Sequence, residues 1–382
     1  MKNICFFAHA ANLTGANKSM LELIVQLNKS ERYKCSVILP CNGPLAKELL
    51  KNNIEFKVIR SFSWIVSLSG KDRIKSILRN KLNFIAIYKI KKYLKDKNID
   101  LIHVNTLLSG IGAIVANEMK IKYIWHIREF MEEDHGIEFL NKKLAFKLLG
   151  NASGLIAISD DIKEKYERLL NKEVIQIYNG IDYDTYNIPE KKNLYKDSVE
   201  IMIIGRICEG KGQIEAVKAM ELLLKDEELK NYRINLSIIG NKIDDYFDNL
   251  EEYIKNNNLA SNMKILPFSN NINEYRKNCD IQLVCSKNEA FGRVTIEGMI
   301  AKCLVIGAKS GFTKKLIIDG YNGILYESEN YKDLYLKIKK AILNKDLTEQ
   351  IIRNSYEYVK ENFLIQSTAK NVIKYYEELI GG

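Results

Sequence analysis

The hydrophobic positions of this chain form short continuous runs that alternate with longer stretches at helical spacing. The short runs are rich in Ile, Val and Phe, a composition that predicts buried β-strands. They form two series, at 3–8, 35–39, 55–59, 100–104, 122–127, 154–158 and 174–178, and then at 199–204, 234–239, 263–266, 280–285, 303–307 and 323–326. Stretches such as SMLELIVQLNK, IEAVKAMELLLK and YLKIKKAIL carry apolar residues every three or four positions, as amphipathic helices do.

This alternation predicts an α/β protein whose parallel sheets are covered by helices on both faces. Because there are two series of strands, we expect two doubly wound, Rossmann-like domains. Polar turn residues replace the periodicity in 178–197, so the predicted domains are 1–185 and 186–364, with a last helix in 365–382 that returns to the first domain. In such sheets ligands bind beyond the carboxyl ends of the strands, and a cleft between the domains is the expected active site.

Composition narrows the class of protein. The length of 382 residues suits two domains. The seven cysteines are scattered without a CxxC pair, which favours reduced thiols in a cytosol. The N-terminal apolar run is too short for a signal peptide, and no stretch approaches the roughly 20 apolar residues that cross a bilayer. We therefore expect a cytoplasmic protein.

The net charge of +10 is concentrated in residues 1–185, which carry +9. Within them, 71–97 holds ten basic residues against Asp72 and Asp96. This segment also carries apolar residues at helical spacing: Ile74, Ile77, Leu78, Leu82 and Ile85. A basic amphipathic helix favours peripheral binding to the anionic inner face of the cell membrane, whereas a domain helix with solvated lysines is the alternative. Nucleic acid is not an expected partner, because aromatic platforms and a binding motif are missing.

The segment VEIMIIGRICEGKGQIEAVKAM predicts a strand, a glycine-rich turn and a helix. Such a turn offers backbone N–H groups and a positive helix end to a phosphate, and Arg206 and Lys211 add two cations. GRICEGK matches the spacing of a P-loop, but Gly212 stands where a Ser or Thr would hold magnesium. A surface turn, a P-loop and a metal-free clamp for a diphosphate remain alternatives at this point, and the two cations favour the clamp.

The segment SKNEAFGRVTIEGM follows a buried strand, and a helix is expected to begin near Gly292. Gly292 lets the backbone approach a ligand, and the first amides of the helix lack partners within it. Glu297 lies in the first turns of that helix, where a carboxylate can accept from two neighbouring hydroxyls. Glu289 lies in the preceding loop. Two solvated glutamates are the simpler interpretation, and only the combination with GRICEGKG favours a binding site.

These segments together resemble the GT-B glycosyltransferases of the large retaining family 4. The carboxylate pair in EAFGRVTIE is similar to that family's signature, and GRICEGKG to its Arg/Lys motif for the diphosphate. IYNGIDYDTY, LTGANKSMLELIVQL, DLIHVNT, WHIREF and LIAIS resemble further family segments, so the resemblance covers nearly the whole chain. It departs in two loops. Gly15 is followed by Ala16 instead of a second glycine, and SGFTKKL stands where Gly-Gly-x-x-Glu is common.

The resemblance implies roles for individual residues. Arg206 and Lys211 would neutralise the donor diphosphate, and Gly15 would let the first loop approach it. Glu297 would hold the ribose, and Glu289 would contact hydroxyls of the donor sugar. The amides of four consecutive residues would meet the sugar or phosphate: Phe291, Gly292, Arg293 and Val294. His126 matches the family's histidine in the cleft, so His126 and Glu289 are the candidate catalytic residues, while His9 and His103 are weaker candidates.

The expected activity is therefore retaining transfer of a hexosyl group from a nucleotide-sugar, in particular a UDP-sugar. The expected acceptor is a glycan or a lipid-linked acceptor in cell-surface polysaccharide synthesis. We expect no metal and no cofactor beyond the donor, because no strand ends in Asp-x-Asp. Another GT-B-type enzyme, namely a sugar-nucleotide epimerase or a phosphorylase, and a non-catalytic protein that binds nucleotide-sugars remain alternatives.

Overall fold

The structure is a computed structural model that describes residues 1–69, 72–191, 194–195, 198–242, 245–269 and 271–381. The chain divides into two compact units. Unit 1 comprises Met1–Gly180 together with Ile365–Gly382, and unit 2 comprises Ile181–Leu364. Each unit is a Rossmann-like α/β domain, which confirms the predicted fold class.

Unit 1 is built on a parallel sheet that has seven strands in the part of the chain the structure describes, in the order β3-β2-β1-β5-β6-β8-β9. The strands are β1 (Lys2–Phe7), β2 (Tyr33–Leu39), β3 (Glu55–Val58), β5 (Leu101–Val104), β6 (Tyr123–Ile127), β8 (Gly154–Ala157) and β9 (Ile175–Gln176). The predicted first series is confirmed to within a few residues at each end. An antiparallel pair, β4 (Ile65–Ser67) with β7 (Ile137–Phe139), was not predicted.

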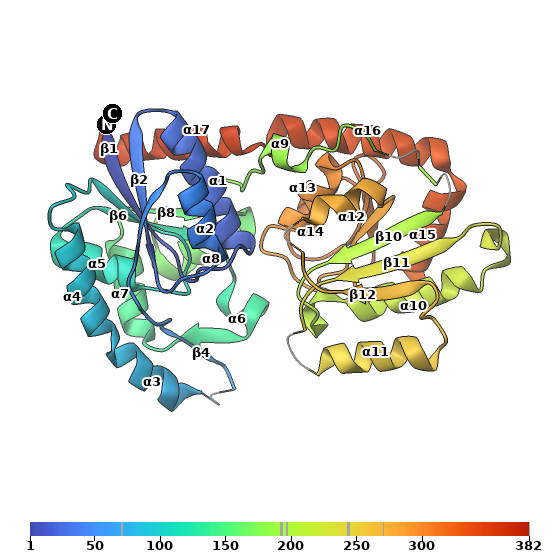
Figure 1. Cartoon of the computed structure of the whole chain (residues 1–382), viewed down its shortest axis with the longest axis horizontal. Coiled ribbons are helices and arrows are strands. Elements are labelled where there is room, and N and C mark those ends of the chain that lie inside the picture. The colour runs from blue at the N-terminus through green and yellow to red at the C-terminus, as the bar shows by residue number, and fades with distance from the viewer. Residues whose placement is uncertain (70–71, 192–193, 196–197, 243–244, 270, 382) are drawn as a thin grey trace. The chain divides into compact units, whose positions relative to one another are not determined.

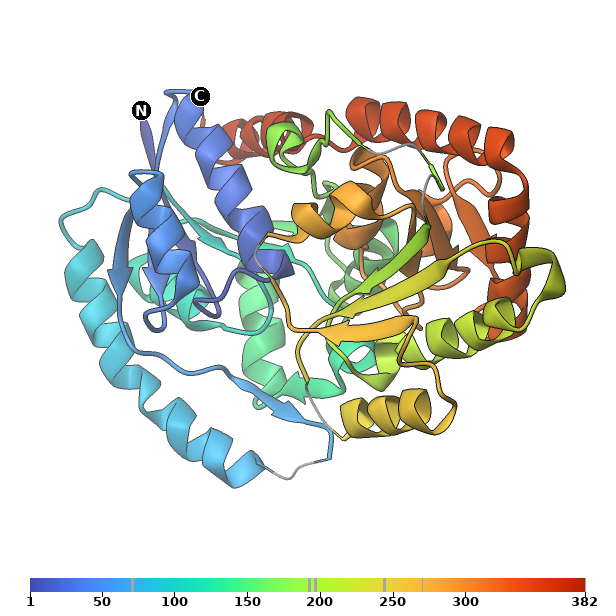
Figure 2. The ribbon, with the colours of Figure 1, turned by 45° about the vertical axis from the view of Figure 1, so that its right-hand side comes forward.

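The helices of unit 1 follow its strands along the chain (Figures 1 and 2). They are α1 (Gly15–Lys29), α2 (Pro44–Lys51), α3 (Arg73–Lys81), α4 (Asn83–Leu94), α5 (Ile111–Met119), α6 (Met131–His135), α7 (Lys142–Asn151), α8 (Asp160–Leu170) and α17 (Ile365–Ile380). Helix α17 is the last in the chain, yet Ile365, Val372 and Tyr376 from it join the apolar core of unit 1. The buried side of this helix therefore belongs to the first domain.

The prediction of a single basic helix over 71–97 is wrong in one respect, because the structure has two helices there, α3 and α4. They meet at Leu82, and Asn83 at the start of α4 is buried. The Asn83 side chain accepts from the Phe62 N–H (2.8 Å) and donates to the Phe62 carbonyl (2.9 Å), so a tertiary contact sets the break. Lys71 lies outside the described residues.

Unit 2 is built on a second parallel sheet, with six strands among its described residues in the order β12-β11-β10-β13-β14-β15. The strands are β10 (Val199–Ile204), β11 (Ile234–Ile239), β12 (Met263–Leu266), β13 (Ile281–Val284), β14 (Leu304–Ala308) and β15 (Ile324–Tyr326). The predicted second series is confirmed. Strands buried on both faces need apolar residues at consecutive positions, which is why continuous runs identified them.

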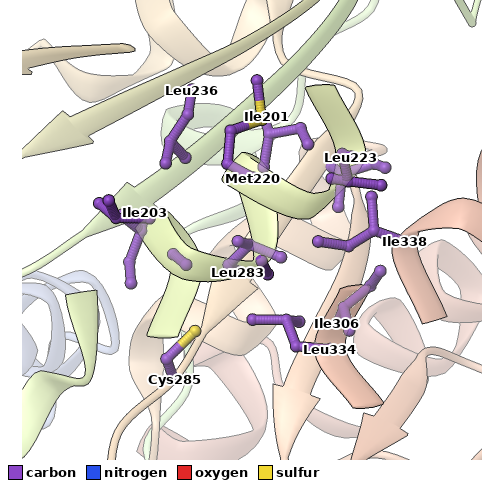
Figure 3. Close-up of a cluster of buried hydrophobic side chains, with 14 of the residues drawn as sticks. Ile201, Ile203, Met220, Leu223, Leu236, Leu283, Cys285, Ile306, Leu334 and Ile338 are labelled. Carbon is purple, nitrogen blue, oxygen red and sulfur yellow. The ribbon is translucent and has the colours of Figure 1, made fainter. Parts of the chain in front are cut away.

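The helices of unit 2 include α10 and α15, whose apolar faces meet the sheet in the core that Figure 3 shows. In that view Ile201, Leu283 and Ile306 from the sheet lie close to Met220 of α10 and Ile338 of α15. The helical segments are α9 (Tyr183–Tyr186), η1 (Glu209–Lys211), α10 (Gln213–Leu224), η2 (Glu227–Leu229), α11 (Tyr246–Asn256), α12 (Ile272–Asn278), α13 (Arg293–Ile300), α14 (Thr313–Leu316), α15 (Tyr331–Leu343) and α16 (Lys345–Asn362).

Both sheets reverse their strand order at one point, between β1 and β5 in unit 1 and between β10 and β13 in unit 2. Helices leave the sheet in opposite directions at such a point, which opens a crevice at the carboxyl ends of the two strands. Each unit therefore has one expected ligand position that topology alone defines. Within the described residues, no helix is both long and apolar enough to cross a bilayer.

Candidate functional site

The loops that follow β10 and β13 lie side by side, because these strands are hydrogen-bonded neighbours. The Lys287 N–H donates to the Gly210 carbonyl (3.0 Å) across the two loops. Gly212 has a φ of +66°, and a Cβ there would lie 2.2 Å from the Cys285 carbonyl oxygen. A side chain would therefore clash with backbone, so Gly212 keeps the first loop pressed against the second. Gly212, which stands where a P-loop has Ser or Thr, therefore has a structural role in packing the two loops together.

Three side chains meet where the loops touch. Lys211 forms a short ion pair with Oε1 of Glu289, and the Ser286 hydroxyl donates to the same oxygen (2.8 Å). Lys211 also donates to Ser286 Oγ (3.3 Å). Among the hydrogen bonds of the described residues, those to the Glu289 carboxylate reach Oε1, so Oε2 retains acceptor capacity.

The charge state of Glu289 follows from this arrangement. Burial raises the pKa of the carboxyl, but the charge and hydrogen bond of Lys211, the hydroxyl of Ser286 and the charge of Arg206 together outweigh it, so the pKa is lowered. Glu289 is therefore a carboxylate at neutral pH. The main chain of Arg206 is held by Gln213, whose amide donates to the Arg206 carbonyl (2.8 Å), and the Arg206 side chain is exposed.

Glu297 lies on α13 and is held by two arginines. Arg276 Nη2 donates to one carboxylate oxygen (2.8 Å), and Arg293 Nε donates to the other (3.2 Å). Arg276 is almost fully buried, and its Nη1 has no hydrogen-bond partner in the described part of the chain. Arg293 also donates to the Tyr186 hydroxyl (2.9 Å), and both guanidinium groups lie 5.8 Å from the centre of the Tyr186 ring.

Helix α13 begins at Arg293, as predicted, and Gly292 precedes it with a φ of +84°. The Phe291 side chain is buried and stacks on Phe312, with ring centres 5.5 Å apart, so its contribution to a ligand would come from the backbone. The Phe312 N–H donates to the Glu289 carbonyl (2.9 Å). The SGFTKKL segment, where the sequence departs from the usual family pattern, therefore packs directly on the Glu289 loop.

Unit 1 carries a different cluster at its own strand ends. His126 near the end of β6 is fully buried, and its Nδ1 lies 3.2 Å from both His103 Nε2 and Arg128 Nη2. His103 Nδ1 lies 2.6 Å from the Tyr376 hydroxyl. Arg128 also donates to the side chains of Asn105 (3.0 Å) and Asn179. His126 Nε2 is buried without a hydrogen-bond partner among the described residues.

The predicted site residues thus fall into two groups. Seven of those in unit 2 belong to the two adjacent loops and to the start of α13: Arg206, Lys211, Glu289, Phe291, Gly292, Arg293 and Val294. Glu297 lies one turn further along α13. Gly15 is the exposed first residue of α1 in unit 1, where an added Cβ would meet no atom within 4 Å. His126 lies in unit 1, in the buried cluster.

Several residues that complete these clusters were not predicted as site residues. In unit 2 they are Ser286 and Arg276, and in unit 1 they are Arg128, Asn179 and Tyr376. Arg128 and Asn179 lie in the quoted segments WHIREF and IYNGIDYDTY, so the signal was present. Arg276 and Tyr376 have no local signal. In the described part of the chain, no three His, Cys, Asp or Glu side chains cluster in a way that could hold a metal ion.

Comparison with known proteins decides the family. The family described as Glycosyl transferases group 1 matches residues 184–358, and Glycosyltransferase Family 4 matches residues 13–185. The chain belongs to these glycosyltransferases. It is an enzyme that transfers a glycosyl group, and its fold is of the GT-B type.

Relatives and solved structures similar to this glycosyltransferase are consistent with its assignment to the family. An uncharacterized glycosyltransferase of Methanocaldococcus jannaschii is 28% identical over 309 residues, which cover 77% of this chain and 80% of that protein. A capsular polysaccharide biosynthesis glycosyltransferase of Staphylococcus aureus is 25% identical and matches 56% of this chain and 59% of its own length. The crystal structure of Anabaena HepE in complex with UDP and glucose superposes with a TM-score of 0.81 at 20% identity, over 99% of this chain and 100% of that one.

Proposed function

We propose that this glycosyltransferase moves a hexosyl group from a UDP-sugar to a glycan or lipid-linked acceptor, with retention of the anomeric configuration. The observation that carries the proposal is the group of Arg206, Lys211, Ser286 and Glu289 at the strand-order reversal of unit 2. Two cations and a carboxylate at that position match a diphosphate and a sugar bearing hydroxyls.

The donor would be held by charges that are already in place. Arg206 and Lys211 would meet the diphosphate, and Lys211 would keep its contact with Glu289 while it does so. Oε2 of Glu289 would accept from a hydroxyl of the sugar. Arg276 and Arg293 each hold one oxygen of the Glu297 carboxylate, and we propose that this oriented carboxylate accepts from the two hydroxyls of a ribose.

Chemistry would follow from the departure of the diphosphate. As the glycosidic bond breaks, negative charge grows on the leaving phosphate, and preorganised cations stabilise that charge more than they stabilise the intact donor. The acceptor would attack from the face that the diphosphate leaves, which retains the configuration. With two side-chain cations at the phosphates, we propose that the reaction needs no metal ion.

The acceptor class is inferred from relatives. Besides the capsular enzyme, a Campylobacter jejuni protein named as an N-acetylgalactosaminyltransferase acting on a diphospho-undecaprenol-linked sugar is 26% identical over 201 residues. That match covers 52% of each protein. We propose that this chain likewise extends a glycan, free or lipid-linked, in cell-surface polysaccharide synthesis.

A panel of UDP-sugars with saccharide and lipid-diphosphate acceptors tests the proposal, with product detected by mass spectrometry and its anomeric configuration by NMR. Product with the donor's configuration supports it, and inverted product overturns the mechanism. Change of the UDP-sugar without an acceptor would indicate an epimerase, and release of sugar phosphate from glycan and phosphate would indicate a phosphorylase. Binding of UDP-sugar without turnover of any acceptor would indicate a non-catalytic binding protein.

We also propose that α3 and α4 hold the enzyme on an anionic membrane surface. Helix α3 has no buried residue, and large apolar side chains are exposed on both helices and just before them: Leu68, Ile74, Ile77, Leu78, Leu82, Phe84, Ile85 and Tyr88. A cavity of about 300 Å³ lies beside helix α3, and Ile77 and Lys81 line it together with the buried Trp64 and Ile111. A helix that only completed a domain would bury one face, so the exposed apolar row favours insertion at a lipid surface.

Exposed lysines and arginines border this apolar row. Arg73, Lys91 and Lys97 are engaged by Glu138, Glu118 and Glu55. A charge variant should therefore replace other basic residues, namely Lys75, Arg79, Lys89 and Lys92 by Gln. At about 1 kcal/mol for each charge near anionic lipid, it should weaken vesicle binding by up to about 4 kcal/mol at low salt.

Co-sedimentation with vesicles of anionic lipid measures this association. A second variant, Ile74→Ser with Leu78→Ser, should weaken binding even at high salt, because apolar insertion is not screened. Replacing Lys225, Lys302, Lys309 and Lys345 of unit 2 by Gln provides a charge-matched control. Wild-type protein that stays in the supernatant at low salt would show that the lysines are a solvated face.

A further inference from the structure

Unit 1 contains a cavity of about 300 Å³ beside helix α3, and the proposed donor site of unit 2 makes no use of it. Its lining is mostly apolar and includes Trp64, Ile111, Ile114 and Leu144. Gly110 and Ile111 stand at the start of α5, directly after the loop that follows β5, so the cavity lies beyond the carboxyl end of that strand. Doubly wound sheets bind their ligands on that side.

Trp64 fixes the wall of this cavity. Its Nε1 donates to the Leu107 carbonyl (2.7 Å), and its ring stacks on Trp125 with ring centres 5.7 Å apart. A Cβ at Gly110 would lie 2.3 Å from the Trp64 ring, so the glycine lets the backbone pass directly against the indole. Because this wall is in place before a ligand arrives, little ordering cost opposes binding.

Three asparagines line the cavity, and each is bonded to the backbone of unit 1. Asn83 accepts from the Phe62 N–H and donates to the Phe62 carbonyl. Asn80 donates to the Ser63 carbonyl (3.3 Å), and the Asn141 side chain accepts from a backbone N–H of α7 (3.0 Å). Since these amides hold the wall together, the surface that remains for a ligand is chiefly apolar.

The mouth of the cavity combines exposed apolar side chains with a charge. Ile77 of α3 and Leu144 of α7 line the cavity and are also exposed to solvent. Lys81 carries the only formal charge among the described residues of the lining, and it is exposed. The complement of such a site is an amphiphile, with a hydrocarbon chain for the cavity and an anionic group for the ammonium.

We propose that this cavity binds the first part of the hydrocarbon chain of a phosphate-bearing, lipid-linked acceptor, and that Lys81 meets its phosphate. A methylene group is about the size of a water molecule, whose share of liquid volume is about 30 Å³, so the cavity holds roughly ten carbons. The inference rests on the proposed function, because it selects the lipid-linked acceptor over the free glycan. Unit 1 then holds the acceptor lipid itself, apart from any contact of α3 and α4 with a bilayer.

Binding of ethyl, hexyl, decyl and tetradecyl phosphate tests the chain site. Isothermal titration calorimetry without vesicles, below micelle-forming concentrations, gives the affinities. Burial of one methylene group contributes about fourfold in affinity, so decyl phosphate should bind at least about 100-fold more tightly than ethyl phosphate. The affinity should then level off, because the cavity is full at about ten carbons. Affinity that does not depend on chain length, or that rises as steeply from decyl to tetradecyl, would overturn the proposal.

Tryptophan substitutions that fill the cavity test its location. Ile114→Trp with Leu144→Trp should bind decyl phosphate about 10-fold or more weakly than wild type, and ethyl phosphate equally. Ile77→Trp repeats the test without replacing a buried side chain. Leu78→Trp with Leu82→Trp is the matched control, because it adds the same two rings at exposed positions outside the lining. Equal losses in the filled and control variants would overturn the chain site.

Lys81→Gln tests the phosphate contact at an exposed residue. It should weaken binding of decyl phosphate by about 2–5-fold, the scale of an exposed ion pair, and leave binding of decanol unchanged. Lys75→Gln, also exposed on α3, is the control and should change neither. An unchanged affinity for decyl phosphate, or a loss shared with decanol, would overturn the phosphate contact.

Turnover separates the acceptor from an ordinary membrane lipid. For a lipid-linked saccharide that the UDP-sugar panel identifies as an acceptor, replacing the chain by a methyl group should raise KM at least about 10-fold with kcat little changed. Decyl phosphate should compete with the chain-bearing acceptor, whereas ethyl phosphate at the same concentration should not. Dispersed phosphatidylglycerol that competes as well as decyl phosphate would assign the cavity to membrane lipid and overturn the acceptor.

Failure of this inference differs from failure of the proposed function. Turnover of a lipid-linked acceptor with the same KM for either chain would overturn the chain site and leave the proposed function standing. Length-dependent binding of alkyl phosphates without transfer from any UDP-sugar to any acceptor would overturn the proposed function and the choice of acceptor, while the chain site stays supported.

Discussion

Units 1 and 2 share one strand order and fill the equivalent edge of their sheets with different chemistry. In unit 2 the side chains beyond β10 and β13 are charged and partly exposed, with Lys211 and Glu289 as their centre. In unit 1 the side chains near the carboxyl ends of β5 and β6 are buried, and His103 and His126 are neutral members of a hydrogen-bonded chain. The topology therefore selects where a ligand binds, and the residues at that edge select what binds.

The two units also differ in how their side chains are prepared to recognise a ligand. Charges near solvent attract a charged ligand and keep hydration until it arrives, so they cost little stability. Buried neutral donors and acceptors must satisfy one another, and they hold a single direction of hydrogen bonding. The two tryptophans, Trp64 and Trp125, both lie in unit 1. Tryptophan fluorescence therefore follows unit 1, while circular dichroism follows both units.

The largest expected effect concerns Arg276, a fully buried charge of unit 2. Arg276→Met should lower the free energy of unfolding of unit 2 by about 3–5 kcal/mol, because it removes one partner of a buried ion pair with the Glu297 carboxylate. Urea unfolding should show this loss by circular dichroism and leave the tryptophan transition in place. Arg353→Met, at an exposed pair with Glu349, should cost less than about 1 kcal/mol. Comparable losses in the two variants would contradict the buried pair.

The next effect concerns activity. Lys211→Ala and Arg206→Ala should each reduce kcat/KM by about 2–4 kcal/mol of transition-state stabilisation, because each removes a cation from the leaving diphosphate. Lys225→Ala, at the exposed end of α10, should have no such effect. Initial rates on UDP-glucose or another active donor provide the measurement. Activity should survive EDTA, and either full activity in both variants or strict dependence on a divalent metal would reject the two-cation clamp.

The third effect should appear in unit 1 alone and depend on pH. The pKa values of His103 and His126 are lowered, so between pH 7.5 and 5.5 the unfolded chain binds protons that the folded chain does not. Stability is therefore lost as pH falls below the ordinary histidine value, by about 1.4 kcal/mol per pH unit for each histidine, or roughly 1–3 kcal/mol in all over this interval. Urea unfolding followed by tryptophan fluorescence measures it. His103→Gln should show about half the wild-type dependence, and an unchanged dependence would mean that other groups cause it.

The smallest expected effect concerns Ser286, which donates to the Glu289 carboxylate at the charged site of unit 2. Ser286→Ala removes a hydrogen bond from Glu289. It should lower kcat/KM by an amount that corresponds to about 0.5–1.5 kcal/mol of transition-state stabilisation. The same change removes one cause of the lowered pKa of Glu289, so the pKa should rise. A carboxylate with a depressed pKa is lost only as pH falls through that value, so the acid limb of the pH–rate profile should move to higher pH. Ser261→Ala, on the surface, is the control, and identical acid limbs would show that Glu289 does not govern the rate.

The strands and the charged edge of unit 2 could be predicted because their signals are local. A run such as IQLV must be apolar at consecutive positions when helices cover both faces of the sheet. Glu289 and Gly292 lie in the loop that follows this strand, so the order of residues along the chain also indicated their place in space. Parallel neighbours then brought the GRICEGKG turn to the same edge.

What was missed depends on contacts between distant residues. The break between α3 and α4 comes from Asn83 binding the backbone of Phe62, and no proline or glycine marks it. Arg276 belongs to the site because it forms an ion pair with Glu297. Tyr376 belongs to the cluster of unit 1 because it forms a hydrogen bond with His103, which lies 273 residues earlier. No periodicity or spacing encodes such pairs, since each partner is ordinary within its own segment.

The position of α17 has a consequence for how the protein is made. The 184 residues of Ile181–Leu364 are synthesised between the body of unit 1 and the helix that completes its core. At the usual rates of translation this interval lasts roughly 10–40 s. During that time the nascent first domain lacks Val372 and Tyr376, and the groove that they fill stays open. Unit 2 is continuous in the chain and needs no later segment to complete its core, whereas unit 1 can close only after α17 has been synthesised.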